Sequence, residues 1–254
     1  MIACTWWGHS TATIELGDTR VVTDPLLADR LFHLVRHHPT PDPGATRADL
    51  VLVSHLHHDH CHLPSLARYA PDVPMVVPRG AEPVLARIAG DRLVPVVPGD
   101  VVELAGVRVE VLPATHDGRR LPVGRERPPA LGFRVSNDAG SCWYPGDTEL
   151  RADLADVDPV ELALVPVGGW GPTLDDGHLS PEQAAEAVAR VGATWAVPVH
   201  WGTFWPAGLR RIAPANHRRL FETPGERLAD ALAGSGTKAV VLAPGERFAA
   251  LGNG

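Results

Sequence analysis

Residues 49–60 read Asp-Leu-Val-Leu-Val-Ser-His-Leu-His-His-Asp-His, so an aliphatic run leads directly into an H-x-H-x-D-H array. Neutral imidazole and carboxylate are ligands that suit zinc and similar divalent cations. His55 and His57 can point the same way where the chain is extended, while Asp59 and His60 can serve a second ion beside the first. The alternative is a solvated polar loop, which the partners further along the chain disfavour. The segment therefore predicts a strand that ends in a metal-binding loop.

Three further candidate ligands share one property, which is that each follows a predicted strand. They are His116 after 107–112, Asp147 after 141–144 and His200 after 195–199. Ligands at the ends of neighbouring strands can converge on one rim of a sheet. If it occurred alone, His116 or His200 would be interpreted as a structural residue. Asp147 alone would be interpreted as a turn residue in Pro-Gly-Asp. With the first array they total five histidines and two aspartates, which is more than one tetrahedral ion uses and suits two.

Short aliphatic or alternating runs predict strands, and amphipathic patterns between them predict helices. The predicted strands are 11–16, 19–23, 50–54, 74–77, 107–112, 132–136, 141–144, 162–166, 195–199 and 239–242, and the predicted helices are 63–70, 81–90, 181–191 and 224–234. Ser180 is the expected N-cap of the third helix, and Gly192 is expected to end it. Strands interleaved with helices indicate an α/β protein whose helices pack outside its sheets. Two long irregular segments, 28–47 and 117–129, are predicted to be functional loops.

The composition narrows the class of protein. The chain has 254 residues with no evident linker or low-complexity block, which favours one domain over residues 1–254. A net charge of −7 argues against general nucleic-acid binding, because no basic excess would displace counterions from phosphate. Three widely spaced cysteines give no disulfide framework and favour a reducing cytoplasm. Neither a signal peptide nor an apolar run long enough to span a membrane is evident.

The order and spacing of these motifs resemble the metallo-β-lactamase fold hydrolases. The resemblance implies a four-layer αβ/βα sandwich in which two mixed β-sheets are flanked by helices and two metals lie between the sheets. It implies that the first metal is held by His55, His57 and His116, the second by Asp59, His60 and His200, and that Asp147 bridges them. The expected cofactors are two divalent ions, zinc first, with manganese or iron as alternatives because nitrogen and oxygen ligands accept all three.

Finer features resemble one subgroup of that family. It includes L-ascorbate-6-phosphate lactonase-like proteins and N-acyl-phosphatidylethanolamine phospholipase D. The segment Trp-Trp-Gly-His-Ser-Thr at 6–11, followed by Thr-Asp-Pro at 23–25, is similar to the N-terminal hairpin of that subgroup. Segments 177–184 and 199–204 look most like the phospholipase side.

The expected activity is dinuclear metal-dependent hydrolysis of the phosphodiesterase or lactonase type. A metal-bridging hydroxide would attack a small ester, lactone or phosphodiester. Asp59 would orient that hydroxide while it binds a metal, and His178 would donate a hydrogen bond or a proton. Two residues stay open: His9 lies near the site or stabilises a turn, and Asp24 is a candidate hydrogen-bond partner of a metal-binding histidine.

Four residues are candidates for binding the substrate, which is expected to be a small and anionic molecule. Arg119 and Arg120 could grip a phosphate or carboxylate, and the alternative is a solvated loop. Trp170 and Trp201 are predicted to line the pocket, although aromatic residues there belong equally often to a core. The sequence leaves the oligomeric state open.

Two other functions compete with hydrolysis on this scaffold. Di-iron redox relatives carry a carboxylate at the second ligand position, where this chain has His57, and need a flavin partner domain for which 254 residues leave no room. A non-catalytic binding protein would have lost ligands, and here none is missing. Hydrolysis is therefore the preferred interpretation.

Overall fold

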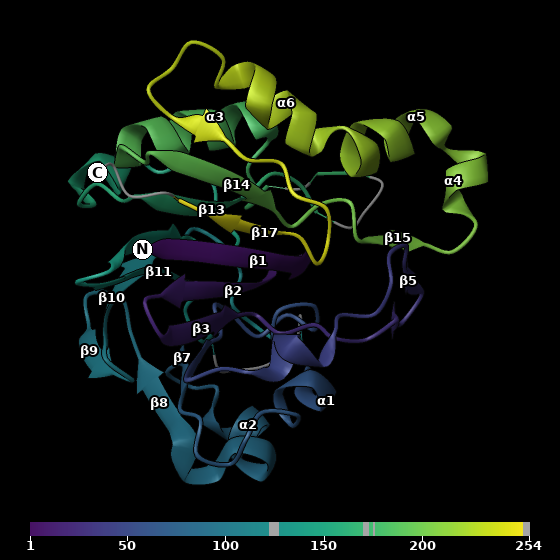
Figure 1. Cartoon of the computed structure of the whole chain (residues 1–254). Helices are drawn as coiled ribbons and strands as arrows, with labels where there is room; N and C mark the ends of the chain where they lie inside the picture. Colours follow the sequence, from purple (N-terminus) through teal and green to yellow (C-terminus); the bar gives the residue numbers. More distant parts are fainter. Residues whose placement is uncertain (122–126, 170–172, 175, 251–254) are drawn as a thin grey trace.

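The computed structural model describes residues 1–121, 127–169, 173–174 and 176–250. In this part of the chain two large mixed sheets of seven strands each lie face to face (Figure 1). In order across the first sheet the strands are β17 (Arg247–Ala249), β1 (Ile2–Gly8), β2 (Thr11–Leu16), β3 (Thr19–Thr23), β6 (Leu50–Leu52), β7 (Met75–Pro78) and β8 (Leu93–Val96). Across the second they are β16 (Lys238–Ala239), β14 (Trp195–Val199), β13 (Leu162–Pro166), β12 (Gly140–Tyr144), β11 (Leu131–Asn137), β10 (Val107–Pro113) and β9 (Val101–Leu104).

The two sheets have matching topologies. In the first, β1, β2 and β3 form an antiparallel meander, and β6, β7 and β8 follow β3 in parallel. In the second, β9 to β12 are antiparallel neighbours, and β13, β14 and β16 follow β12 in parallel. Strands β1, β3 and β6 therefore run in one direction, and β10, β12, β13 and β14 share a direction in the other sheet. Loops that leave these strands all emerge from the same edge of their sheet.

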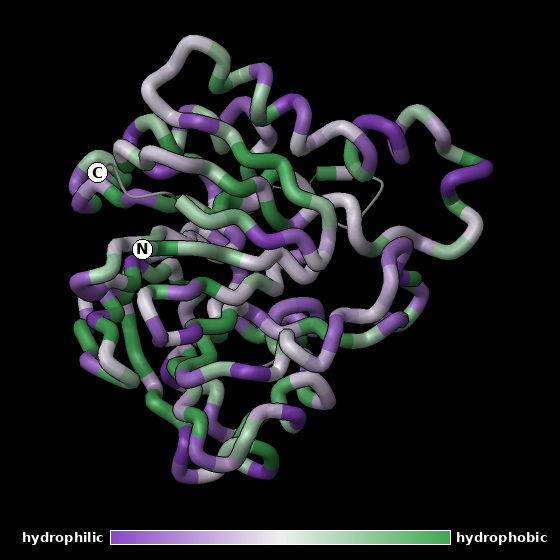
Figure 2. The backbone as a smooth tube through the Cα atoms, in the orientation of Figure 1, coloured by the Kyte–Doolittle hydropathy of each residue, from purple (hydrophilic) through white to green (hydrophobic). Residues whose placement is uncertain are grey.

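Apolar side chains fill three layers, and Figure 2 shows hydrophobic residues concentrated along the central strands. The largest cluster lies between the sheets and includes Ile14, Leu50, Phe133 and Leu164, none of which is exposed. A second cluster joins the second sheet to α3 (Pro181–Val191) and α6 (Pro224–Ala231). A third joins the first sheet to α1 (Leu63–Leu66) and α2 (Glu82–Ala89). This is the predicted four-layer sandwich, and the fold prediction is confirmed.

Helix α3 begins and ends where its sequence predicts. The Ser180 hydroxyl accepts from the Gln183 amide, and the Gln183 side chain accepts from the Ser180 amide, which completes a capping box. Gly192 follows the helix with a φ of 70°, a left-handed conformation that favours glycine. Strands 11–16, 19–23, 162–166 and 195–199 also have the predicted bounds.

Three predicted segments are wrong. The strand predicted at 239–242 is instead β16, which covers only Lys238–Ala239. Helix 63–70 stops after one turn, because the buried Tyr69 points its hydroxyl to the Ala45 carbonyl and the chain turns towards β7. Segment 28–47 is not irregular throughout, because it holds β4 (Arg30–Leu31), β5 (Leu34–Arg36) and a 3-10 turn at Pro43–Thr46. Strand β5 pairs with β15 (Phe204–Pro206), a partner too distant in sequence for a local pattern to indicate.

Several elements were not expected. They are β1, β8, β9, β17, β15, α4 (Leu209–Ile212) and α5 (Pro214–His217). In Figure 1, α4, α5, β15 and β5 extend to one side of the sandwich, away from both chain ends. Among the described residues, no helix is both long and apolar enough to cross a membrane.

Candidate metal centre

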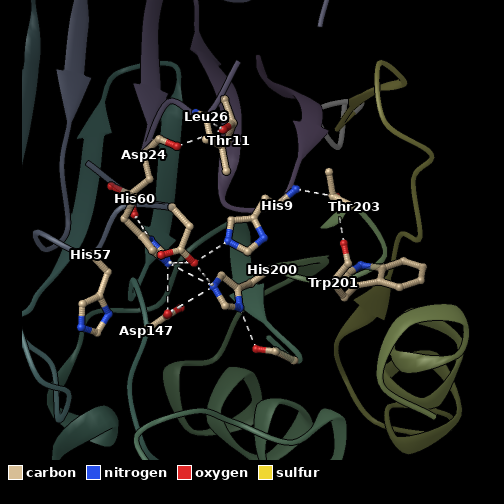
Figure 3. A network of polar contacts seen from close by, with 12 residues as sticks. His9, Thr11, Asp24, Leu26, His57, His60, Asp147, His200, Trp201 and Thr203 are labelled. Carbon is tan, nitrogen blue, oxygen red and sulfur yellow. Dashed lines mark hydrogen bonds and ion pairs between the residues drawn. The ribbon is translucent and has the colours of Figure 1, made fainter. Parts of the chain in front are cut away.

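The predicted ligands meet at one edge of the sandwich, and Figure 3 shows part of this cluster. Each follows a strand whose direction delivers it there: the 55–60 loop follows β6, and His116, Asp147 and His200 follow β10, β12 and β14. The shared strand directions bring together residues that lie far apart in the chain. The structure therefore places these side chains together on one rim of the sandwich, as the sequence predicts.

One group consists of three histidines, His55, His57 and His116, whose ring nitrogens approach closely. His55 Nε2 lies 3.0 Å from His57 Nδ1, and His57 Nδ1 lies 3.2 Å from His116 Nε2. His55 is fully buried, and the other two are partly exposed. Two ligands of one ion, each about 2.1 Å from it, would lie about 3.0–3.5 Å apart, so these separations suit a shared cation.

A second group surrounds His60 and His200, neither of which is exposed. Their Nε2 atoms lie 3.1 Å apart, and Asp147 Oδ2 lies 3.1 Å from the first and 3.2 Å from the second. Asp59 Oδ2 lies 3.6 Å from each of the two Nε2 atoms. Asp147 also falls in a cluster with His116, so its carboxylate stands between the two groups.

The outer hydrogen bonds of these histidines fix which nitrogen carries the proton. His200 Nδ1 donates to the Gly168 carbonyl at 2.7 Å, and His60 Nδ1 faces Asp24 Oδ2 at 2.6 Å. When both rings are neutral, each has one N–H, so both Nε2 atoms present lone pairs, which face each other at 3.1 Å. His116 Nδ1 likewise donates to the Gly177 carbonyl at 3.0 Å, which leaves a lone pair on its Nε2. Converging lone pairs repel unless a cation lies between them, so the donor set fits metal ions.

Asp147 supplies a further test of this fit. Its side chain is 2% exposed, yet Oδ1 is buried without a hydrogen-bond partner within the described structure. A buried carboxylate oxygen left unpaired costs free energy, and such groups are normally paired or bound to a metal. The orphaned oxygen is accounted for if a cation binds there.

The electrostatic environment also favours the ligand forms of these residues. Burial lowers the pKa of His55, and it lowers that of His116 to about 4, so both rings are neutral near pH 7. Burial acts against ionisation of Asp147, but the neighbouring His200, His60 and His178 together outweigh it and hold the pKa of Asp147 well below its usual value. His60 differs: burial lowers its pKa, but the surrounding carboxylates outweigh this and raise it. A bound cation would take the place of the proton that those carboxylates attract.

Asp24 lies behind the centre, where it is placed to be the hydrogen-bond partner of a candidate ligand histidine that its sequence context predicts. Besides facing His60, its carboxylate accepts from the Ser54 amide at 2.7 Å and from the hydroxyls of Ser54 and Tyr144. The residue is fully buried. Such outer hydrogen bonds orient a ligand ring and raise its basicity.

The predicted substrate residues have other partners in the structure. Arg119 pairs with Asp117, and Arg120 donates to the carbonyls of Leu56 and Cys61 and contacts His58 Nδ1 at 2.9 Å. Arg120 therefore holds both ends of the ligand loop together. The prediction that these guanidiniums bind an anionic substrate stays a prediction.

The two tryptophans and His178 complete the set of candidates. Trp201 stacks on Trp6 with ring centroids 5.7 Å apart and donates to the Pro198 carbonyl, so it packs between elements of the sandwich. Trp170 lies outside the described residues. His178 is partly exposed, and its Nε2 lies 3.4 Å from Asp147 Oδ2. His178 thus joins the cluster on its more open side.

Replacing Arg120 by alanine is expected to lower the free energy of unfolding by about 1–3 kcal/mol, because the Cys61 carbonyl at the end of the ligand loop would lose a charged donor. The measurement is urea unfolding of the metal-free protein. The matched control is Arg119→Ala, whose lost ion pair with Asp117 is solvent-exposed and should change little. Equal losses in the two variants would contradict the role assigned to Arg120.

The sequence is compatible with two roles for His9, near the site or within a turn. The structure places its side chain inside the cluster. Its Nε2 lies 2.8 Å from Asp59 Oδ2, and its ring centroid lies 4.1 Å from that of His200. His9, Asp24 and His200 all have positive φ values, of 52°, 34° and 63°. Left-handed non-glycine residues concentrate at functional sites, but no local sequence signal marks them as a group.

The sequence is similar to known metal-dependent hydrolases. Residues 19–201 match a family described as the beta-lactamase superfamily domain. The chain is 31% identical to an uncharacterized protein of Mycobacterium tuberculosis, over 97% of this chain and 68% of that protein. It is 30% identical to a metal-dependent hydrolase of Thermoplasma acidophilum, over 87% of this chain and 91% of that one. It is also 28% identical to N-acyl-phosphatidylethanolamine-hydrolyzing phospholipase D 1 of Caenorhabditis elegans, over 79% of this chain and 64% of that enzyme.

A solved structure shares the fold. Igni18, a metallo hydrolase from Ignicoccus hospitalis, superimposes with a TM-score of 0.73 over 97% of both chains, at 20% sequence identity. At that identity the likeness concerns the arrangement of sheets and helices. The arrangement matches the four layers described above.

Proposed function

Because the chain belongs to the metallo-β-lactamase superfamily and is a metal-dependent hydrolase, we propose that it binds two divalent cations and cleaves a small ester, lactone or phosphodiester. One observation carries the proposal: the lone pairs of His60 Nε2 and His200 Nε2 face each other at 3.1 Å, each fixed by a hydrogen bond on the opposite side of its ring. Two neutral rings in this arrangement repel each other unless a proton or a metal ion lies between them. The surrounding carboxylates attract a proton to His60, and a bound cation would replace it. All the residues involved come from one sandwich, which supports a single hydrolase domain over residues 1–254.

We assign one ion to each of the two groups of side chains described above. His55, His57 and His116 would hold the first ion, Asp59, His60 and His200 would hold the second, and Asp147 lies close enough to both groups to serve either ion. Ions bound there would lower the pKa of a shared water towards neutrality and polarise an oxygen of the substrate. The donors are all nitrogen and oxygen, which suits zinc and also accepts manganese or iron.

Charge balance supports two ions over one. The carboxylates of Asp24, Asp59 and Asp147 lie within the cluster, and their partners in the described structure are histidines, hydroxyls and backbone groups. No Arg or Lys forms an ion pair with any of the three in that part of the chain. Two divalent cations together with one hydroxide would neutralise three carboxylates.

Two side chains, Asp59 and His178, would act on the water and the substrate during hydrolysis. Asp59 would accept a hydrogen bond from the attacking water and so orient it, since its carboxylate is buried and held by His9. His178 is partly exposed and lies 3.4 Å from Asp147, so its N–H can reach the developing oxyanion or the leaving group. A cavity of about 500 Å³, lined by Glu149, Leu174 and His178 among others, adjoins this ring and is large enough for a small substrate.

The test is hydrolysis by protein loaded with Zn²⁺, Mn²⁺ or Fe²⁺, with oxygen consumption measured on the iron-loaded sample. We expect two ions per chain and turnover of at least one of three probes: bis(p-nitrophenyl) phosphate, δ-valerolactone and p-nitrophenyl acetate. Two bound ions with oxygen consumption and no hydrolysis would instead favour the di-iron redox alternative. Two bound ions without turnover of any probe and without oxygen consumption would favour a binding protein. Absence of bound metal would refute the proposal.

A further inference from the structure

His9 is held in an unusual backbone conformation directly after β1. Its φ is 52°, and it follows Gly8, whose φ is 105°. In the left-handed region the Cβ of a non-glycine residue lies too close to the following carbonyl oxygen, so this conformation persists only where its surroundings impose it. The β1–β2 register also shifts at this point, between Trp6 and Gly8.

Three hydrogen bonds impose the conformation of His9. Its amide donates to Thr203 Oγ1 at 2.7 Å. Its carbonyl accepts from Trp6 Nε1 at 2.8 Å and from the His200 amide at 2.9 Å. The backbone of His9 is thus tied to the segment that carries His200, as Figure 3 shows for the contact with Thr203.

These anchors bury the His9 ring against the metal centre. The residue is 1% exposed, its ring lies 4.1 Å from that of His200, and the edge of Phe204 approaches it at 5.8 Å between centroids. The polar contact of the ring is made by Nε2, which lies 2.8 Å from Asp59 Oδ2. The same carboxylate oxygen faces His60 and His200.

The distances separate a supporting role for His9 from a ligand role. The ring nitrogens of His60 and His200 lie 3.1 Å from each other and 3.1–3.6 Å from the carboxylate oxygens of Asp59 and Asp147, separations that suit ligands around a shared cation. The 2.8 Å between His9 and Asp59 is shorter and is typical of an N–H···O hydrogen bond.

We propose that His9 is a positioning residue whose Nε2–H donates to Asp59 Oδ2 and fixes the orientation of that carboxylate towards the second metal ion. The inference rests on the two-metal centre proposed above and adds to it the residue that follows β1. Without this donor, Asp59 would rotate among orientations and hold the ion less tightly. Losing such an outer partner typically lowers metal affinity or activity by 10–100-fold.

The test compares two variants at position 9. His9→Leu keeps a side chain of comparable bulk and removes the donor, whereas His9→Gln places an amide N–H at a similar distance from the backbone. Zn²⁺ or Mn²⁺ is titrated into each protein against a chromogenic chelator, and kcat and KM are measured on the best of the three probes. The control is His33→Gln, because His33 is exposed and lies outside the cluster.

We expect His9→Leu to keep one ion at wild-type affinity, to bind the other roughly 10–100-fold more weakly, and to lose kcat with little change in KM. His9→Gln should recover part of both losses. The inference is overturned if His9→Leu binds both ions as wild type does. It is also overturned if the Leu and Gln variants are equally impaired, since ring packing would then matter more than the hydrogen bond.

A further variant separates failure of this inference from failure of the proposed function. His200→Ala should lose the second ion outright, because His200 is a proposed ligand. If wild type and His200→Ala bind metal equally, the two-metal centre is wrong, and the role of His9 falls with it. If His200→Ala loses an ion and His9→Leu does not, the centre stands and only the role of His9 is wrong.

Discussion

Asp147→Asn is expected to lower kcat/KM by roughly 10³-fold and to weaken the binding of both metal ions. The carboxylate lies 3.1 Å from His60 Nε2, 3.2 Å from His200 Nε2 and 3.4 Å from His178 Nε2. Asparagine keeps the size of the side chain but removes its negative charge and one ligand oxygen. The centre would then hold two positive ions with one carboxylate fewer, at a position that is 2% exposed and poorly screened.

The measurement combines steady-state kinetics with metal content determined by atomic emission. Asp138→Asn is the matched control, because Asp138 is exposed in the turn between β11 and β12. If Asp147→Asn retained two ions and wild-type turnover, Asp147 would have no place between the metals. A fold check by circular dichroism separates loss of metal from loss of structure.

Removing the metal ions is expected to lower the melting temperature by about 10 °C. The expectation follows from linkage, since a ligand present at a thousand times its Kd stabilises the folded state by about 4 kcal/mol. In a protein of this size each kcal/mol shifts the melting temperature by about 2–4 °C. Without ions, the carboxylates of Asp59 and Asp147 and the facing imidazoles of His60 and His200 would lack the charge that balances them.

Calorimetry before and after chelation, and again after Zn²⁺ is restored, provides the measurement. His200→Ala should show a smaller shift than wild type, because it lacks one proposed ligand of the second ion. If metal analysis showed that chelation had removed the ions and the melting temperature of wild type stayed unchanged, bound metal would not stabilise the fold.

The framework of the protein is encoded in local patterns of its sequence. Alternating and aliphatic runs depend on neighbours one to four positions away, so strands such as 162–166 and the capped helix at 181–191 are predictable from the sequence alone. The H-x-H-x-D-H array is equally local, and its position after an aliphatic strand indicates a metal-binding rim. Since strand ends in a sandwich share an edge, the sequence also indicates that His116, Asp147 and His200 join it.

The hydrogen bonds that orient these candidate ligands depend instead on contacts between distant parts of the chain. His9 and Asp59 are fifty positions apart, and their contact depends on the strained turn after β1, which no short-range pattern encodes. Arg120, which the sequence offers as a substrate residue, also donates to the carbonyls of Leu56 and Cys61 at the ends of the ligand loop, a contact that no local pattern indicates. Hydrogen-bond partners, and hence which nitrogen of His60 or His200 faces the centre, are set by atoms that meet only after the sheets have packed.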